Sequence, residues 1–139
     1  AKSNNFNDAL PSLEYVVKNT TKITAAEAKY MIAEGYYNKP DLAKSETTIR
    51  ELLKMKPGYD YWIAKSLILQ TRILIQKKDL FQAENTIKSV IDHYTVMDDG
   101  IQAEAGELYD EIMQLKSQPK VIQSPDQNTV IEIEDNSGN

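Results

Sequence analysis

Hydrophobic residues return every three or four positions along most of this chain, which is the spacing of amphipathic helices. Turn-forming residues separate the segments that carry this pattern. The segments are residues 8–18, 24–37, 42–55, 60–77, 80–94 and 101–116. The segment 60–77 is apolar over the widest arc, so we expect it to form the most buried helix.

Capping residues mark where several of these helices should begin. Asp41 and Asp79 stand just before their segments and are good N-caps. Thr24 and Glu27 form a capping-box pattern at the start of the second segment. Pro11 fits only near the start of the first helix, where its missing N–H costs no hydrogen bond.

Small residues recur in two alternating series, each followed by a large apolar residue. In the first series the large residue comes three positions later, and in the second it comes four positions later. The pairs are Ala33 and Tyr36, Thr71 and Leu74, Gly106 and Tyr109, then Ala9 and Leu13, Ser45 and Ile49, Ala83 and Ile87. A small residue lets a neighbouring helix approach and the large one fills the gap beside it, so the pattern predicts stacked helix pairs.

This pattern resembles the tetratricopeptide repeat (TPR), a helix hairpin of roughly 34 residues. The resemblance covers residues 7–116, with two complete repeats that begin at Ala26 and Ala64. A half-repeat precedes them and a single helix follows. The chain departs from the family where Lys29 and Leu67 replace the usual Trp, and where Pro40 and Lys78 replace the Gly of the inner turn.

The resemblance implies an all-α fold, a right-handed α-α superhelix of TPR-like helix hairpins with a flexible C-terminal tail. We expect a leader at residues 1–6, a repeat domain at 7–117 and a tail at 118–139. The tail is rich in Pro, Asn, Gln and Ser, and its alternating stretch at 130–134 predicts at most one strand.

Composition removes several classes of function. The net charge of −5 argues against nucleic acid as a partner, because phosphate binding needs clustered Lys and Arg. The chain has no Cys, so it has no disulfide or thiolate site. No apolar run is long enough to span a bilayer, so we expect no direct membrane insertion. The polar start, residues 1–5, suggests a fragment of a larger repeat protein.

Candidate chemistry is sparse, and we expect neither an enzyme nor a cofactor or metal site. His93 is the single histidine and has no carboxylate at ligand spacing on its helix face, so it should lie near the last carbonyls of its helix. No Ser lies in a nucleophile elbow. Tyr59, Tyr61 and Trp62 could form a stacking platform for a ligand, but we favour packing between helices for them.

The resemblance also implies a partner-binding surface, because the first helices of TPR hairpins line a concave face. The corresponding residues are Tyr30, Glu34, Tyr37, Asn38, Lys65, Ile68, Arg72, Ile75 and Gln76. Two tyrosines beside Lys65 and Arg72 would hold an extended peptide by stacking and charge-assisted hydrogen bonds. A merely solvated face is the alternative. The carboxylate clamp that some family members use for chaperone C-termini is absent, since Tyr30, Glu34 and Leu69 stand at its positions.

We therefore expect a protein–protein interaction scaffold that binds a protein or peptide on its concave face. The alternative is structural self-association, as a homodimer formed through the N-terminal half-repeat. That half-repeat should leave an apolar strip around Leu10, Leu13 and Val17 without a partner helix. The loose repeats and the aromatic run at 58–62 are similar to those of bacterial cell-envelope repeat proteins, which implies a periplasmic or cell-envelope location.

Overall fold

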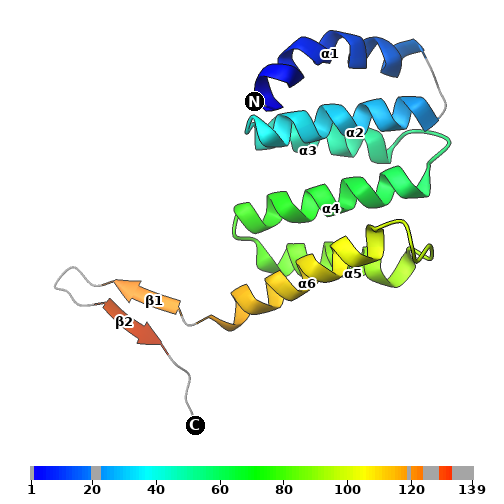
Figure 1. Cartoon of the computed structure of the whole chain (residues 1–139). Coiled ribbons are helices and arrows are strands. Elements are labelled where there is room, and N and C mark those ends of the chain that lie inside the picture. Colours follow the sequence, from blue (N-terminus) through cyan, green and yellow to red (C-terminus); the bar gives the residue numbers. More distant parts are fainter. Residues whose placement is uncertain (1, 20–22, 119, 124–128, 133–139) are drawn as a thin grey trace.

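The computed structural model describes residues 2–19, 23–118, 120–123 and 129–132, with side chains for 5–19 and 23–118. These residues form six helices followed by a two-stranded hairpin (Figure 1). The elements are α1 (Lys2–Asn19), α2 (Ile23–Asn38), α3 (Leu42–Leu53), α4 (Asp60–Gln76), α5 (Leu80–His93), α6 (Ile101–Ser117), β1 (Lys120–Gln123) and β2 (Thr129–Glu132).

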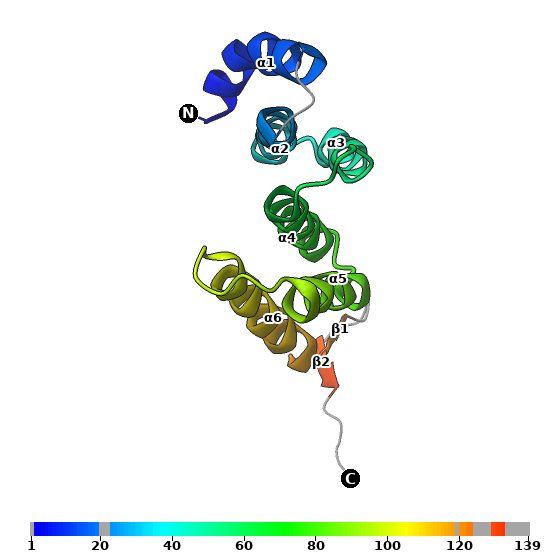
Figure 2. The ribbon, with the colours of Figure 1, turned by 90° about the vertical axis from the view of Figure 1, so that its right-hand side faces the viewer.

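Helices that follow one another along the chain pack side by side, and α4 also packs against both α2 and α6. Figure 2 shows the result as two columns, with α2, α4 and α6 along one side of the domain and α3 and α5 along the other. The helix α1 lies over α2 at one end of the stack. The domain before the hairpin is therefore all-α, as the sequence predicts.

Two clusters of buried side chains hold the helices together, and α4 contributes to both. Leu69 and Ile73 of α4 belong to the cluster shared with α2 and α3, which also contains Ala33 and Ile49. The other cluster lies between α4, α5 and α6, and Ile68 is among its members. The wide apolar arc of α4 explains why one helix can serve two cores.

Four of the six small residues are buried where paired helices meet. Ala9 and Gly106 are only half-buried, and no neighbouring helix lies within 4 Å of a Cβ atom built on Gly106, so the close contact predicted there is wrong. Ala33 in α2 and Ser45 in α3 have no exposed surface, and Ser45 Oγ donates a hydrogen bond of 2.7 Å to the backbone carbonyl of Ala33. Thr71 in α4 and Ala83 in α5 are equally buried. A short side chain such as that of Ser45 can reach the backbone of a neighbouring helix only where the two helices lie close together. The small residues at these positions predict such a close approach of α2 and α3.

Two of the expected N-caps are confirmed. Asp41 accepts a hydrogen bond of 3.1 Å from the amide of Lys44, and Asp79 accepts one of 3.2 Å from the amide of Gln82. The capping box at Thr24 is wrong, because α2 already begins at Ile23. Cap patterns are local, and an extra residue at a helix start is enough to displace them.

The first helix also begins earlier than expected, at Lys2 rather than at residue 8, and Pro11 lies inside it. Phe6, which was expected in a leader, is buried. Pro11 removes one backbone donor from the helix interior, where the bond would have gone to the carbonyl of Asn7. Pro11 and Asn7 are both exposed, so water can donate a hydrogen bond to the carbonyl of Asn7 instead.

The C-terminal segment contains two strands where the sequence predicted at most one. β1 and β2 pair in antiparallel fashion, with Lys120 opposite Glu132 and Gln123 opposite Thr129. The alternating stretch overlaps β2 at residues 130–132, whereas the sequence of β1, KVIQ, does not alternate between apolar and polar residues. The other residues of the expected tail lie outside the described residues, apart from Gln118.

Candidate functional site

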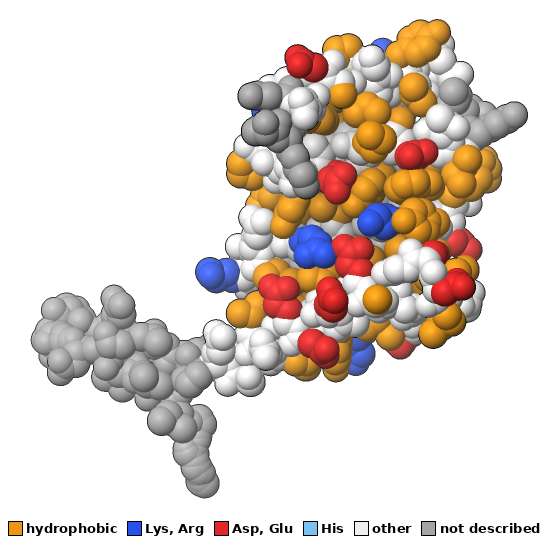
Figure 3. Space-filling view, in the orientation of Figure 1, with side chains coloured by type: hydrophobic (Ala, Val, Ile, Leu, Met, Phe, Trp, Pro, Cys, Tyr) orange, Lys and Arg blue, Asp and Glu red, His pale blue; other side chains and the backbone are white. Residues whose placement is uncertain are grey.

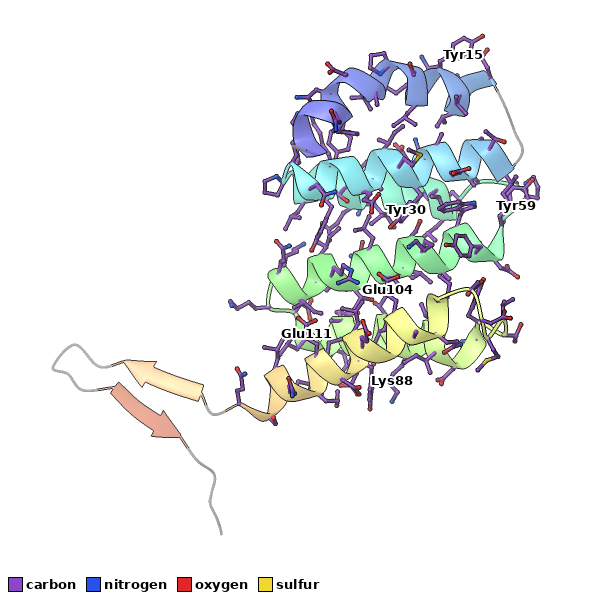
Figure 4. The ribbon with its side chains drawn as sticks, viewed as in Figure 1. Tyr15, Tyr30, Tyr59, Lys88, Glu104 and Glu111 are labelled. Atoms are coloured by element: carbon purple, nitrogen blue, oxygen red, sulfur yellow. The ribbon has the colours of Figure 1, made fainter. Side chains whose placement is uncertain are left out.

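One groove of about 320 Å³ opens on the side of the domain formed by α2, α4 and α6. We call it the α2–α4–α6 groove. Its lining residues are Tyr30, Glu34, Tyr37, Asn38, Lys65, Ile68, Leu69, Arg72 and Glu104. Seven of these belong to the set that the sequence placed on the concave face. Figure 4 shows Tyr30 between α2 and α4, and Glu104 between α4 and α6.

Helical spacing explains why these residues converge. On α2, Glu34 and Tyr37 follow Tyr30 by four and seven residues, and positions with this spacing share a helix face. On α4, Ile68 and Arg72 follow Lys65 by three and seven residues. Because α2 and α4 pack side by side, the two stripes become opposite walls of the groove.

Glu104 of α6 closes the groove on its third side and pairs with both of its basic residues. Its Oε2 lies 2.7 Å from Arg72 Nη2, and its Oε1 lies 3.6 Å from Lys65 Nζ. All three side chains are only partly exposed, which strengthens the pairs relative to fully solvated ones. One carboxylate is therefore shared by two cations.

Tyr30 forms part of the groove floor. It is 8% exposed, its ring centroid lies 5.5 Å from that of Trp62, and Lys65 Nζ lies 5.6 Å from its ring centroid. Burial raises the pKa of Tyr30, and the carboxylates of Glu34 and Glu104 raise it further. Arg72 opposes them and lowers the pKa. The pKa of this phenol therefore lies further from neutrality than that of an ordinary tyrosine.

The last two residues predicted for the concave face take other positions. Gln76 Nε2 donates a hydrogen bond of 2.9 Å to the hydroxyl of Tyr37, which links α4 to α2 beside the groove. Ile75 packs against the core cluster between α4 and α6. Neither residue lines the groove.

Glu104 and Leu69 are the groove residues that the sequence analysis missed. In the sequence, Leu69 stands out only as a residue at a position of the absent carboxylate clamp. Glu104 lies on a helix that matches just half of a repeat, so the family register says little about it. A usable signal was the acidic series Glu104, Glu107 and Glu111 on one face of a helix that follows the basic positions of α4.

The other candidate residues are engaged in packing or local contacts. Trp62 packs against the core between α2, α3 and α4, and its ring meets Tyr61 edge-on at 4.9 Å. His93 Nδ1 lies 3.0 Å from the carbonyl of Ser89, one turn back in the same helix. Among the residues that the structure describes, no three His, Asp or Glu side chains lie close enough together to hold a metal ion.

The apolar strip expected on the first helix is partly covered. α1 packs along α2, and Leu10, Leu13 and Val17 are all half-buried. Leu13 lines a second hollow, of about 220 Å³, between α1 and α2. Met31, Glu34 and Asn38 of α2 line the same hollow.

No protein-family model matches the chain, and comparisons with curated proteins and with solved structures find no match either. None of the helices in the described part of the chain is both long enough and apolar enough to cross a bilayer. The function is therefore argued from the groove itself.

Proposed function

We propose that this chain is a TPR-like interaction module whose α2–α4–α6 groove binds an extended segment of a partner protein. The observation that carries the proposal is the convergence of two tyrosines, Ile68 and four charged side chains from three helices on one groove. Stacked helix pairs with buried small residues support the superhelical arrangement that the resemblance implies.

The composition of the groove suits a peptide. Ile68 and Leu69 provide an apolar floor, Tyr37 provides an aromatic wall, and Asn38 and Gln76 supply hydrogen-bonding groups at the edge. A volume of about 320 Å³ is at the lower end of the range for ligand pockets. Side chains of an extended segment would fill it, while the backbone of that segment lies across the helices.

We propose binding rather than catalysis because three of the four charged groups of the groove pair with one another. Arg72 and Lys65 share Glu104, and Tyr30 is held in its protonated form. A general base near neutral pH requires a group with a pKa close to 7, and the pKa of Tyr30 moves away from that value.

Site-specific photo-crosslinking tests the proposal. A photoreactive phenylalanine replaces Tyr37 in the groove or, as a matched control, Phe81, an exposed aromatic residue on α5 in the opposite column. Irradiation in a lysate of the source cells should give a discrete adduct from position 37 that an excess of unlabelled chain abolishes. An adduct from position 81 alone would contradict binding in the groove.

Self-association through α1 is the second candidate. Tyr15 supports it, since this large aromatic side chain is 67% exposed and points away from α2 (Figure 4). Sedimentation of the wild-type chain and of Tyr15→Glu separates the two readings. A dimer that Tyr15→Glu dissociates would favour self-association, whereas a monomer at all concentrations tested would reject it.

A further inference from the structure

We infer that the α2–α4–α6 groove takes a basic partner segment, in which an Arg or Lys side chain pairs with Glu34 and a nearby apolar side chain enters the hollow between α1 and α2. This inference rests on the proposed function and specifies the chemistry of the partner. It reverses the simplest interpretation of the sequence, in which Lys65 and Arg72 would attract an acidic partner.

The two cations of the groove already have a carboxylate partner within the chain. Glu104 pairs with both of them, at 2.7 Å from Arg72 and 3.6 Å from Lys65. A partner carboxylate that approached these cations would also meet the negative charge of Glu104, which repels it.

Glu34 is the charged group that remains. It is exposed, and no Lys, Arg or His among the described residues lies within ion-pair distance of it. It also lines both the α2–α4–α6 groove and the hollow between α1 and α2, as does Asn38. A cation that bound Glu34 would therefore sit at the junction of the two depressions.

The C-terminal end of α2 and the acidic face of α6 both favour a positive charge. α2 has no basic residue in its last turn, although the negative end of the helix dipole lies there. On α6, Glu107 and Glu111 follow Glu104 along one helix face. Neither of them forms an ion pair with Lys65 or Arg72. Figure 3 shows acidic side chains around the small basic group on this face.

The hollow between α1 and α2 supplies the apolar half of the recognition. Ala9 and Leu13 of α1 and Met31 of α2 line it, and Met31 is 45% exposed. Methionine adapts its shape to different apolar side chains, which suits a binding surface. Side chains two positions apart lie on the same side of an extended segment, so a basic residue and an apolar residue at that spacing fit the two depressions together.

Two peptides test the inference by fluorescence anisotropy with the full chain. Both are capped and labelled; one repeats Arg-Ser-Leu-Ser three times and the other repeats Glu-Ser-Leu-Ser three times. We expect the basic peptide to bind at least about tenfold more tightly, the factor that one charge-assisted hydrogen bond supplies. Its affinity should fall as salt is added.

Matched variants locate the interaction. Glu34→Gln should weaken binding of the basic peptide about tenfold. Asp92→Asn removes the same charge from an exposed position on α5 and should change the affinity less than about twofold, because long-range attraction is screened. Equal losses in both variants would show that only the net charge of the chain matters, and would overturn the inference.

The remaining outcomes separate the two proposals. If the acidic peptide binds more tightly and Tyr37→Ala weakens it, the groove binds a partner but the inferred charge is wrong. If neither peptide binds, the inference is wrong as well. If the basic peptide binds and neither Glu34→Gln nor Tyr37→Ala affects it, both proposals fail at this groove.

Discussion

The ring of Phe6 in α1 occupies the space that a side chain at Gly35 of α2 would need. A Cβ atom built on Gly35 would overlap three carbon atoms of that ring. The same ring meets Tyr36 edge-on, with centroids 5.0 Å apart and an interplanar angle of 72°. Gly35 is therefore the residue that allows α1 to pack closely on α2.

Gly35→Ala should destabilise the chain. The added methyl displaces the Phe6 ring, and overpacking of this kind costs about 1–3 kcal/mol, which outweighs the roughly 0.5–1 kcal/mol that alanine gains in a helix. Urea unfolding followed by circular dichroism measures the change in the free energy of unfolding.

The sign should reverse when Phe6 is removed. In a Phe6→Ala background the steric conflict is gone, so Gly35→Ala should stabilise by about 0.5–1 kcal/mol through helix propensity alone. If Gly35→Ala has the same effect in both backgrounds, Phe6 does not pack on Gly35.

Ala33→Leu tests the contact between α2 and α3. Ala33 is fully buried and its carbonyl accepts the hydrogen bond from Ser45, so a larger side chain should push the helices apart and cost about 1–3 kcal/mol. Ala43→Leu places the same side chain on an exposed position of α3 and should be nearly neutral. Thermal melts of the two variants that coincide would contradict the assigned repeat register.

Lys78→Gly should stabilise the turn between α4 and α5. Lys78 has a φ of 64°, in the left-handed region that disfavours side chains by roughly 1–2 kcal/mol. Lys77, with a φ of −80°, is a matched control in which glycine should destabilise. A denaturant midpoint that falls in Lys78→Gly would show that the side chain of Lys78 contributes more than its backbone conformation costs.

Tyr94 should ionise late in an alkaline titration. Burial raises its pKa from 10.0 to about 12, and the hydrogen bond that its hydroxyl donates to Asp99 contributes. Because the folded pKa lies above the unfolded one, the stabilisation is complete below about pH 10 and is lost as the pH rises towards 12. The difference in tyrosinate absorbance between the wild-type chain and Tyr94→Phe isolates this step.

Asp99→Asn provides the control for that titration. Without the carboxylate, the step assigned to Tyr94 should move to lower pH, since a neutral partner no longer opposes the phenolate. If the difference between the wild-type chain and Tyr94→Phe instead shows a step centred at pH 10, Tyr94 is neither buried nor bonded to Asp99 in solution.

Helix positions were predictable because each depends on neighbouring residues. Asp41 and Asp79 identified two starts correctly, and the small residues Ala33 and Ser45 identified a packed helix pair. The exceptions involve distant contacts. Phe6 was assigned to a leader because nothing near it in sequence reveals that Gly35 leaves space for its ring.

The groove was predictable in part for the same reason. The spacing of Tyr30, Tyr37, Lys65 and Arg72 follows from two helices and a known register. The charge pairing in the groove could not be predicted from the sequence in the same way, because it depends on Glu104. This residue comes from a third helix and lies 32 residues after Arg72. A contact of that separation is set by tertiary packing rather than by local pattern.

Chemical-shift mapping measures partner binding by the groove most directly. The isotope-labelled chain is titrated with the Arg-Ser-Leu-Ser peptide while backbone amides and the Arg72 side chain are observed. We predict saturable shifts that centre on residues 34–38 of α2 and 65–72 of α4 and that Glu34→Gln reduces. Shifts confined to α3 and α5, or no saturable shift at all, would contradict a partner-binding surface on α2, α4 and α6.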